Sequence, residues 1–94
     1  MRRAARVDTN QSSIVDGLRA FGASVFIASA LHGGMGDLIV GYRGRNYLLE
    51  VKDPSKPKAD RAQTPDQVKF QAGWLGQYAV VETLEQAIAI ISEV

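Results

Sequence analysis

The chain has 94 residues, 46% of them hydrophobic and 22% charged, which is typical of a globular domain rather than of a disordered or fibrous chain. This length predicts one domain over residues 1–94 with a modest core, with which dimerisation is compatible. The absence of cysteine excludes a disulfide framework, a zinc–thiolate site and a thiol nucleophile. No apolar run approaches the roughly 20 residues of a membrane helix, and no signal-peptide core follows Met1, so we expect a cytoplasmic protein without membrane contact.

The net charge of +1 says little about nucleic acid, but the charges are unevenly distributed. Bases gather in the middle of the chain, at Arg43, Arg45, Lys52, Lys56, Lys58 and Arg61. After Asp66 the only base is Lys69, against three glutamates. This basic region is compatible with a phosphate-facing surface, and scattered solvated charge is an equal alternative.

The N-terminal part of the chain predicts an arm followed by a helix. Residues 1–9 show no strong periodicity, and we expect them to form a flexible arm. Residues 10–21 carry apolar residues at helical spacing, which predicts a helix with one apolar face. Thr9 or Asn10 would cap its start, and Gly22 suits the left-handed position that ends many helices.

A short strand is predicted over residues 24–28, and a glycine-rich loop over residues 29–36 follows it. His32 lies in this loop. It is either a proton shuttle or phosphate contact, or an ordinary surface histidine. The sequence leaves both alternatives open.

The next stretch has the pattern of a β-hairpin. The apolar runs Leu38–Val40 and Tyr47–Leu49 flank a short turn centred on residues 43–45, which predicts strands over residues 37–41 and 46–52. The runs are nearly continuous, which favours strands that are covered on both faces.

Three charged side chains are expected to meet at the open end of this hairpin. Alternation along a strand puts Glu50 and Lys52 on one face and Val51 on the other. In an antiparallel hairpin the start of one strand lies beside the end of the next, which brings Asp37 to the same place. Two carboxylates and a lysine together suit a metal-dependent phosphodiesterase site. The structural alternative is a surface ion pair of Glu50 and Lys52, worth under about 1 kcal/mol, with Asp37 as a turn residue.

Residues 53–63 contain two prolines and a run of bases, which predict an irregular cationic loop. This loop either closes on nucleic acid or is a mobile solvated connection. A helix should follow over residues 64–75, because Thr64 is a suitable N-cap and Gln67 completes a capping box. Gly76 is a natural stop for that helix.

A strand over residues 77–81 and a helix that opens at Thr83 complete the predicted order, helix, strand, strand, strand, helix, strand, helix. The segment from the third strand to the fourth is a strand–helix–strand crossover, which usually makes the two strands parallel. We therefore expect an α/β fold with a small mixed sheet flanked by helices on both faces.

These residues resemble the PD-(D/E)XK nuclease superfamily, whose core is an acid at the start of one strand and a (D/E)-x-K pattern on the next. Asp37 and Glu50-Val51-Lys52 match this core. The likeness is greatest to the small VRR-NUC-like branch, which includes stand-alone phage and bacterial forms. Three further features of that branch recur here: a glycine-rich lead-in (residues 33–36), a Ser/Thr-Pro-x-Gln helix start (residues 64–67) and a tryptophan before a glycine and a valine-rich strand (residues 74–81).

The resemblance covers about residues 8–92. It implies a restriction-endonuclease-like core and a metal-dependent endonuclease that hydrolyses DNA phosphodiester bonds with Mg²⁺, which Mn²⁺ can replace. It implies catalytic roles for Asp37, Glu50, Lys52 and Gln67, and metal contacts from Asp37, Glu50, the carbonyl of Val51 and Asp8, with Asn10 and Gln11 as the next candidates for the last of these. The family commonly has a proline before the first acid, where this chain has Gly36, and this departure removes no ligand.

Small relatives of this kind also imply a homodimer that cuts branched DNA such as a Holliday junction, in a bacterial or phage-infected cell. The residues expected to contact the DNA are Arg43, Arg45, Lys56, Lys58 and Arg61. A catalytically silent DNA-binding module, or a subunit that needs a partner, is the alternative, and it would keep the basic region without metal dependence. A protein–protein adaptor is a third interpretation and predicts no salt-sensitive DNA binding. The complete set of two acids and a lysine favours the enzyme.

Overall fold

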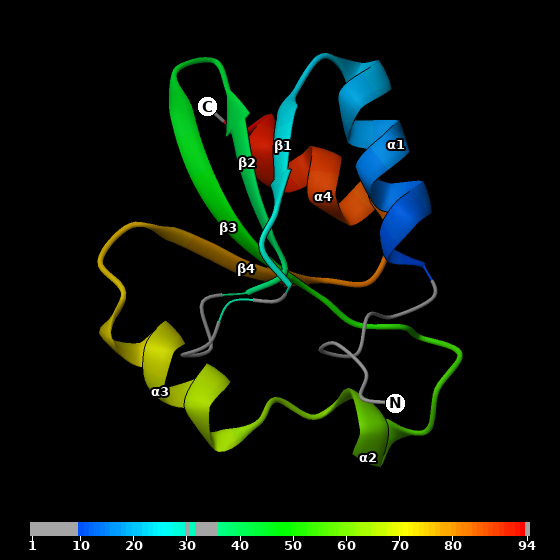
Figure 1. Ribbon diagram of the computed structural model, residues 1–94, viewed down its shortest axis with the longest axis vertical. Helices are drawn as coiled ribbons and strands as arrows, with labels where there is room; N and C mark the ends of the chain where they lie inside the picture. Colours follow the sequence, from blue (N-terminus) through cyan, green and yellow to red (C-terminus); the bar gives the residue numbers. More distant parts are fainter. Residues whose placement is uncertain (1–9, 30, 32–35, 94) are drawn as a thin grey trace.

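The computed structural model describes residues 10–29, 31 and 36–93 (Figure 1). Its elements are α1 (Gln11–Phe21), β1 (Ser24–Ile27), β2 (Leu38–Tyr42), β3 (Arg45–Val51), α2 (Lys58–Arg61), α3 (Pro65–Gly73), β4 (Gln77–Val81) and α4 (Leu84–Ile91). The expected arm over residues 1–9, which contains Asp8, and His32 lie outside the described residues. No described helix has the length and apolar character needed to cross a membrane.

The four strands form one mixed sheet in the order β1-β2-β3-β4, which confirms the predicted fold class. The first two pairings are antiparallel, and β3 pairs with β4 in parallel. Tyr42 pairs with Arg45, so the loop between β2 and β3 consists of Arg43 and Gly44 alone. These two residues have φ values of 53° and 78°, as the two-residue type I′ hairpin turn requires. The turn is therefore one residue shorter than predicted.

The hydrophobic core lies on the face of the sheet that α1 and α4 cover (Figure 1). Val40, Leu49 and Val51 project into it from the strands and meet Leu18 of α1 and Ile91 of α4, and each of the five is at most 1% exposed. Full burial of one such side chain contributes about 1.5–3 kcal/mol. Apolar contact on this single face therefore supplies most of the packing that holds the sheet.

The ends of the helices follow the sequence signals except at the start of α1. Gly22 ends α1 in the left-handed conformation, with φ at 111°, and Thr64 starts α3 with the predicted capping box. Asn10 precedes α1, but its side chain makes no capping hydrogen bond. Its amide instead donates to the carbonyls of Lys52 and Glu82. Asn10 therefore occupies the predicted N-cap position without capping the helix through its side chain, because two strand ends engage that side chain. The alternative cap, Thr9, lies outside the described residues.

The second face of the sheet is covered less than the sequence suggested. None of the described residues of α3 is buried, although helices were expected to cover both faces of the sheet. Residues 68, 70, 72 and 74 are spaced by two, and on a helix this spacing spreads side chains around the axis rather than along one stripe. The helix also ends at Gly73 rather than close to Gly76. It is held near the sheet by a few contacts at Gln67 and Phe70.

Residues 53–63 are not wholly irregular, which corrects the prediction of a loop throughout. The four residues of α2 form one helical turn directly after Pro57. A proline at a helix start carries no penalty, because the first N–H groups of a helix have no partner within it. Before this turn, Asp53 accepts hydrogen bonds from the backbone N–H of Ser55 at 2.9 Å and from its hydroxyl at 2.7 Å. These bonds fix the chain as it leaves β3.

Candidate active site

The end of β3 carries charged side chains on the face opposite the core. Leu49 and Val51 point into the core, and Glu50 and Lys52 therefore point away from it. They are nevertheless 4% and 8% exposed. Lys52 Nζ lies 3.3 Å from Glu50 Oε2. A buried ion pair is expensive to desolvate and persists only where further hydrogen bonds hold it.

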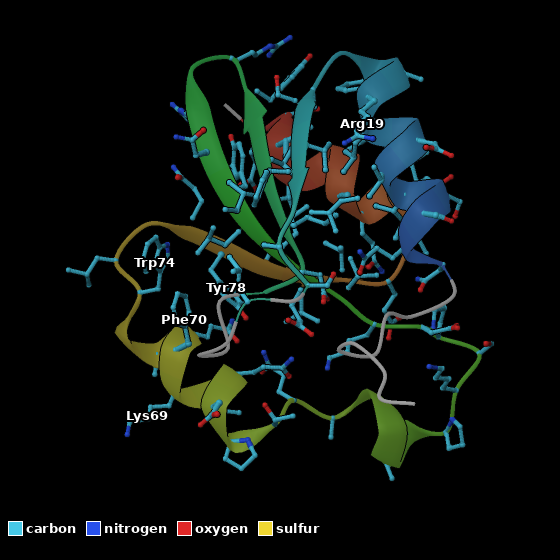
Figure 2. All side chains as sticks on the ribbon, in the orientation of Figure 1. Arg19, Lys69, Phe70, Trp74 and Tyr78 are labelled. Atoms are coloured by element: carbon cyan, nitrogen blue, oxygen red, sulfur yellow. The ribbon has the colours of Figure 1, made fainter. Side chains whose placement is uncertain are left out.

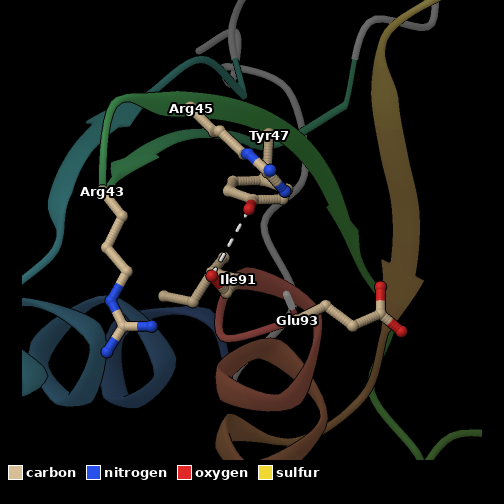
Figure 3. Close-up of a pocket in the computed structure, with 5 residues that line it drawn as sticks. All are labelled: Arg43, Arg45, Tyr47, Ile91 and Glu93. Atoms are coloured by element: carbon tan, nitrogen blue, oxygen red, sulfur yellow. Dashed lines mark hydrogen bonds between the residues drawn. The ribbon is translucent and has the colours of Figure 1, made fainter.

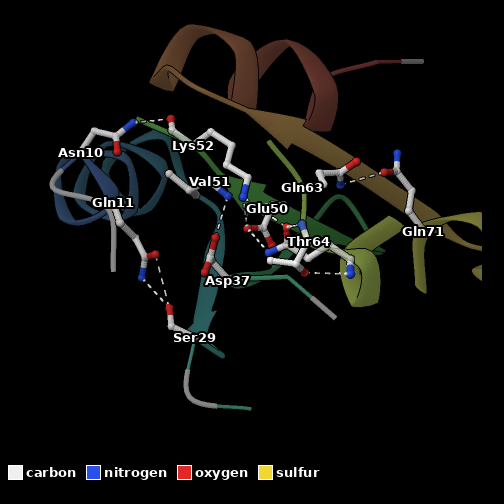
Figure 4. A network of polar contacts seen from close by, with 11 residues as sticks. Asn10, Gln11, Ser29, Asp37, Glu50, Val51, Lys52, Gln63, Thr64 and Gln71 are labelled. Carbon is white, nitrogen blue, oxygen red and sulfur yellow. Dashed lines mark hydrogen bonds and ion pairs between the residues drawn. The ribbon is translucent and has the colours of Figure 1, made fainter. Parts of the chain in front are cut away.

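Asp37 is fixed against the same strand. Its backbone N–H donates to Leu49 at 2.8 Å, and its carbonyl accepts from Ala28 at 2.7 Å. Its carboxylate oxygen Oδ2 accepts a hydrogen bond from the backbone N–H of Val51 at 2.7 Å (Figure 4). Gly36, just before it, has φ at 109° and passes so close to Leu49 that an added Cβ would lie 3.1 Å from that carbonyl. A side chain at this position would be strained, so glycine permits the close approach of the chain to β3.

Gln67 links the start of α3 to the buried ion pair. Its Oε1 accepts from the backbone N–H of Thr64 at 2.9 Å and from Lys52 Nζ at 3.2 Å. Its Nε2 donates to Glu50 Oε2 at 2.7 Å. The two donors can only donate, so both require the amide oxygen and leave the amide nitrogen for the carboxylate. The helix cap thus fixes the orientation of Gln67 toward Glu50 and Lys52.

The electrostatics of this cluster follow from its burial. Burial and the nearby charge of Asp37 raise the pKa of Glu50 from 4.5 to about 7, against the opposing effect of Lys52. Burial also raises the pKa of Tyr78 to about 12, with the charges of Glu50 and Asp37 adding to the shift. Because the charge of Asp37 raises the pKa of Glu50, the two carboxylates act on one another at the end of β3.

The donor set fits a hard divalent ion. Asp37 and Glu50 supply carboxylate oxygens, which Mg²⁺ prefers, and Mg²⁺ takes only one or two carboxylates and retains several waters. The described residues contain no group of three or more histidine, cysteine, aspartate or glutamate side chains that would enclose a metal. Two carboxylates leave further coordination positions of such an ion to water or substrate.

Asn10 contacts the backbone at the end of β3. Its Nδ2 donates to the carbonyl of Lys52 at 3.0 Å (Figure 4). The same nitrogen donates to the carbonyl of Glu82 at 2.9 Å. The neighbouring Gln11 is buried and exchanges hydrogen bonds with the hydroxyl of Ser29. Both side chains therefore have structural roles at the ends of strands.

The predicted DNA-contacting residues are separated in space. Arg45 begins β3 and Glu50 lies five residues along it, which is about 17 Å at the rise of a strand. Arg43 and Arg45 instead line a hollow of about 220 Å³ with Tyr47, Ile91 and Glu93, at the hairpin end of the sheet (Figure 3). Tyr47 closes it by donating a hydrogen bond from its hydroxyl to the carbonyl of Ile91 at 3.3 Å.

The other predicted bases lie on the connection between β3 and α3. Lys56 is half-buried and Lys58 is exposed at the start of α2. The backbone of Arg61 ends α2, and its side chain lies outside the description. This connection begins directly after Lys52. Along the chain it is therefore closer to the candidate site than the hairpin turn with Arg43 and Arg45 is.

Sequence reasoning missed two contributors to the site. It assigned Asn10 to a helix cap or to the metal rather than to the carbonyl of Lys52. It also gave Tyr78 no role, although the parallel register places it beside Leu48 on the face of Glu50. Strand alternation would find Tyr78 only once that register is known, because a shift of one residue turns the side chain to the other face.

Comparison with known proteins supports the architecture. A scan against protein-family models finds no match, and no curated protein is similar in sequence. Among solved structures, the chain is similar to one described as a VRR_NUC domain, with a TM-score of 0.60, 22% sequence identity and coverage of 88% of this chain and 90% of that chain. This likeness confirms the fold that the resemblance implied: the chain has the fold of a VRR_NUC domain.

Proposed function

We propose that this protein is a metal-dependent endonuclease that hydrolyses DNA phosphodiester bonds. The observation that carries the proposal is the meeting of Asp37, Glu50 and Lys52 with Gln67 at one end of β3. The fold, shared with a VRR_NUC domain, supports a nuclease in particular. The four side chains come from the end of β3 and from the two segments that contact it, the chain just before β2 and the start of α3.

Asp37 and Glu50 would hold the divalent ion, Mg²⁺ with Mn²⁺ as a substitute. Val51 would add its carbonyl oxygen, because the N–H and C=O of one strand residue point to the same side and its N–H faces Asp37. The ion would neutralise charge on the attacked phosphate and make a water molecule more acidic. It would also relieve the repulsion between the two carboxylates that raises the pKa of Glu50.

Lys52 would stabilise negative charge on the phosphate through its ammonium group. It is held for this by Glu50 and by Gln67 Oε1. Gln67 would act as a positioning residue, since its amide bridges the lysine and the carboxylate. We also propose that Asp8 contacts the metal. The phosphate contacts proposed on the connection after β3 come from Lys56, Lys58 and Arg61. Arg43 and Arg45 would reach only phosphates about 17 Å from Glu50 along β3.

The proposal includes a structure-specific substrate, branched DNA such as a four-way junction, and a homodimer. A single small domain offers one site for one strand, whereas two sites related by a two-fold axis would cut both. Sedimentation at working concentration measures this part. A monomer that cuts junctions at full rate would contradict the dimer.

The test is cleavage of labelled DNA as linear duplex, single strand, flap and four-way junction, each with Mg²⁺, Mn²⁺ or EDTA. We expect cutting that requires metal and that falls about 100-fold or more in Lys52→Ala, Asp37→Ala and Glu50→Gln. Glu85→Gln is the matched control, because Glu85 is exposed on the first turn of α4. It should cut at the original rate.

Folding of each variant is checked by circular dichroism and urea unfolding. Full activity in all three site variants would sink the assignment of the site. DNA binding without cutting under every metal condition would favour the silent module, or a subunit that awaits a partner.

A further inference from the structure

A row of aromatic side chains extends outward from the candidate site along α3. Gln67 and Phe70 are three residues apart on α3 and so share one side of that helix. Trp74 comes directly after the helix, at its C-terminal cap. Because Gln67 contacts Glu50, the row leads from the catalytic cluster to the rings of Phe70 and Trp74 (Figure 2).

The rings contact one another in series. Phe70 and Trp74 are stacked, with centroids 5.2 Å apart and planes 18° apart. Phe70 and Tyr78 are tilted by 42° with centroids 5.8 Å apart. Tyr78 pairs with Leu48 across the sheet, two residues before Glu50. The series thus begins on β4 beside the carboxylates and ends at Trp74.

Trp74 is held in place and yet remains open to solvent. Its residue is 44% exposed, the preceding helix α3 buries none of its described residues, and the neighbouring Leu75 is fully exposed. Gly76 leaves room for the indole, because a Cβ there would lie 2.9 Å from Trp74 Nε1. A ring fixed from one side by Phe70 and left open on its remaining surface is a platform for stacking rather than a part of the core.

We propose that Trp74, supported by Phe70, stacks on an unpaired nucleobase next to the phosphate that Lys52 contacts beside the metal site of Asp37 and Glu50. The substrate class is then DNA with a splayed or unpaired nucleotide beside the cleaved bond. This inference rests on the proposed nuclease function and gives its preference for branched DNA a physical cause. Base–aromatic stacking is tolerant of sequence, because every base has a π face.

A nucleobase fits this platform better than a protein partner does. The platform is continuous with the phosphate-binding cluster through Gln67, and a nucleotide carries its base and its phosphate together. Lys69, exposed on the same helix, offers a charge to the flanking backbone (Figure 2). Bases inside an intact duplex are stacked on each other and present no face, so only an unpaired nucleotide uses the platform.

Trp74 is the only tryptophan in the chain, so its fluorescence reports on this position alone. The test titrates the protein in EDTA with a blunt DNA duplex and with a duplex of equal length that carries a short single-stranded flap. We expect the flap to quench the emission more strongly and to bind more tightly. Trp74→Ala should weaken flap binding by roughly 5- to 100-fold and blunt-duplex binding less than about twofold.

Two variants keep the result interpretable. Trp74→Phe retains a ring and should retain most of the flap affinity, and Leu75→Ala removes an exposed apolar side chain outside the ring series and should change neither affinity. Equal losses on flap and blunt duplex, or no quenching of the original protein by the flap, would overturn the inference. So would loss of self-association in Trp74→Ala with unchanged DNA affinity, which would make the platform an interface between two copies.

The two proposals fail differently. If no DNA is cut under any metal condition, the nuclease itself is refuted. If the protein cuts DNA and Trp74→Ala cuts flap and blunt duplex in the original ratio, only the stacking platform is refuted. A folded Trp74→Ala is checked by its urea midpoint, and the quenching measurement on the original protein needs no variant.

Discussion

The two faces of β3 differ in what holds them. On one face, Leu49 and Val51 are buried among apolar residues of α1 and α4. On the other, Glu50 and Lys52 are buried by polar contacts to Gln67 and by their own ion pair. Neighbouring residues of one strand therefore serve separate purposes. The apolar face stabilises the fold, while the polar face holds like charges together at a cost in stability.

This division has a general physical reason. Apolar packing is indifferent to which large side chain fills a given space, provided the volume is right. A polar cluster tolerates no such exchange, because each donor needs its acceptor. The apolar core and the polar cluster lie on opposite faces of β3. The core can therefore hold the strand in place while different residues form the site.

The largest expected effect compares two adjacent leucines of β3. Leu49→Ala removes a fully buried side chain of the core and should lower the free energy of unfolding by about 2–5 kcal/mol. Leu48→Ala, on the opposite face and outside the core cluster, should cost about half as much. Urea unfolding measures both. Equal costs would mean that the second face is packed as densely as the first.

A smaller effect concerns the charge of Glu50. Its pKa of about 7 in the folded protein lies above the ordinary value of 4.5, so its contribution to stability is complete below about pH 4.5 and is lost as the pH rises through 7. Glu50→Gln cannot ionise. In EDTA it should therefore be more stable than the original protein by about 1–2 kcal/mol at pH 8, after allowance for solvent screening.

This advantage should vanish as the pH falls below about 4.5, where the glutamate becomes protonated in both states. Urea unfolding at the two pH values measures the change, and Glu85→Gln is the exposed control. If Glu50→Gln is instead less stable at pH 8, the attraction to Lys52 outweighs both burial and the repulsion from Asp37.

The smallest effect compares two threonine caps. Thr64 starts α3 and Thr83 starts α4, and each accepts a hydrogen bond from the N–H three residues later. Replacing either by alanine should cost about 1 kcal/mol of stability. Only Thr64→Ala should also slow DNA cleavage, by about fivefold, because only α3 carries a residue of the site. Equal cleavage rates in the two variants would show that the cap does not position Gln67.

Local signals predicted the elements well. The spacing of apolar residues before Gly22, the turn residues around Gly44 and the capping box at Thr64 each act within a few residues, so the sequence contains the whole cause. The convergence of Asp37 and Glu50 was also predictable, because antiparallel pairing around a short turn fixes which residues lie together.

The remaining contacts depend on distances that no local pattern encodes. Asn10 reaches residues 42 and 72 positions away, and Tyr78 joins the site through the register of a parallel pair. Parallel pairing is set by the length and path of the crossover rather than by a turn. The low burial of α3 escaped prediction for a related reason, since apolar content does not reveal whether a surface exists for a helix to pack on.

The sparse packing of α3 affects how the site responds to temperature. Segments with few buried contacts open at free energies well below that of global unfolding. Each opening of α3 would carry Gln67 away from Glu50 and Lys52 while the sheet beneath α1 and α4 stays intact. Amide hydrogens of α3 should therefore exchange faster than those of β3. On heating, the cleavage activity should be lost at a lower temperature than the folded structure of the sheet.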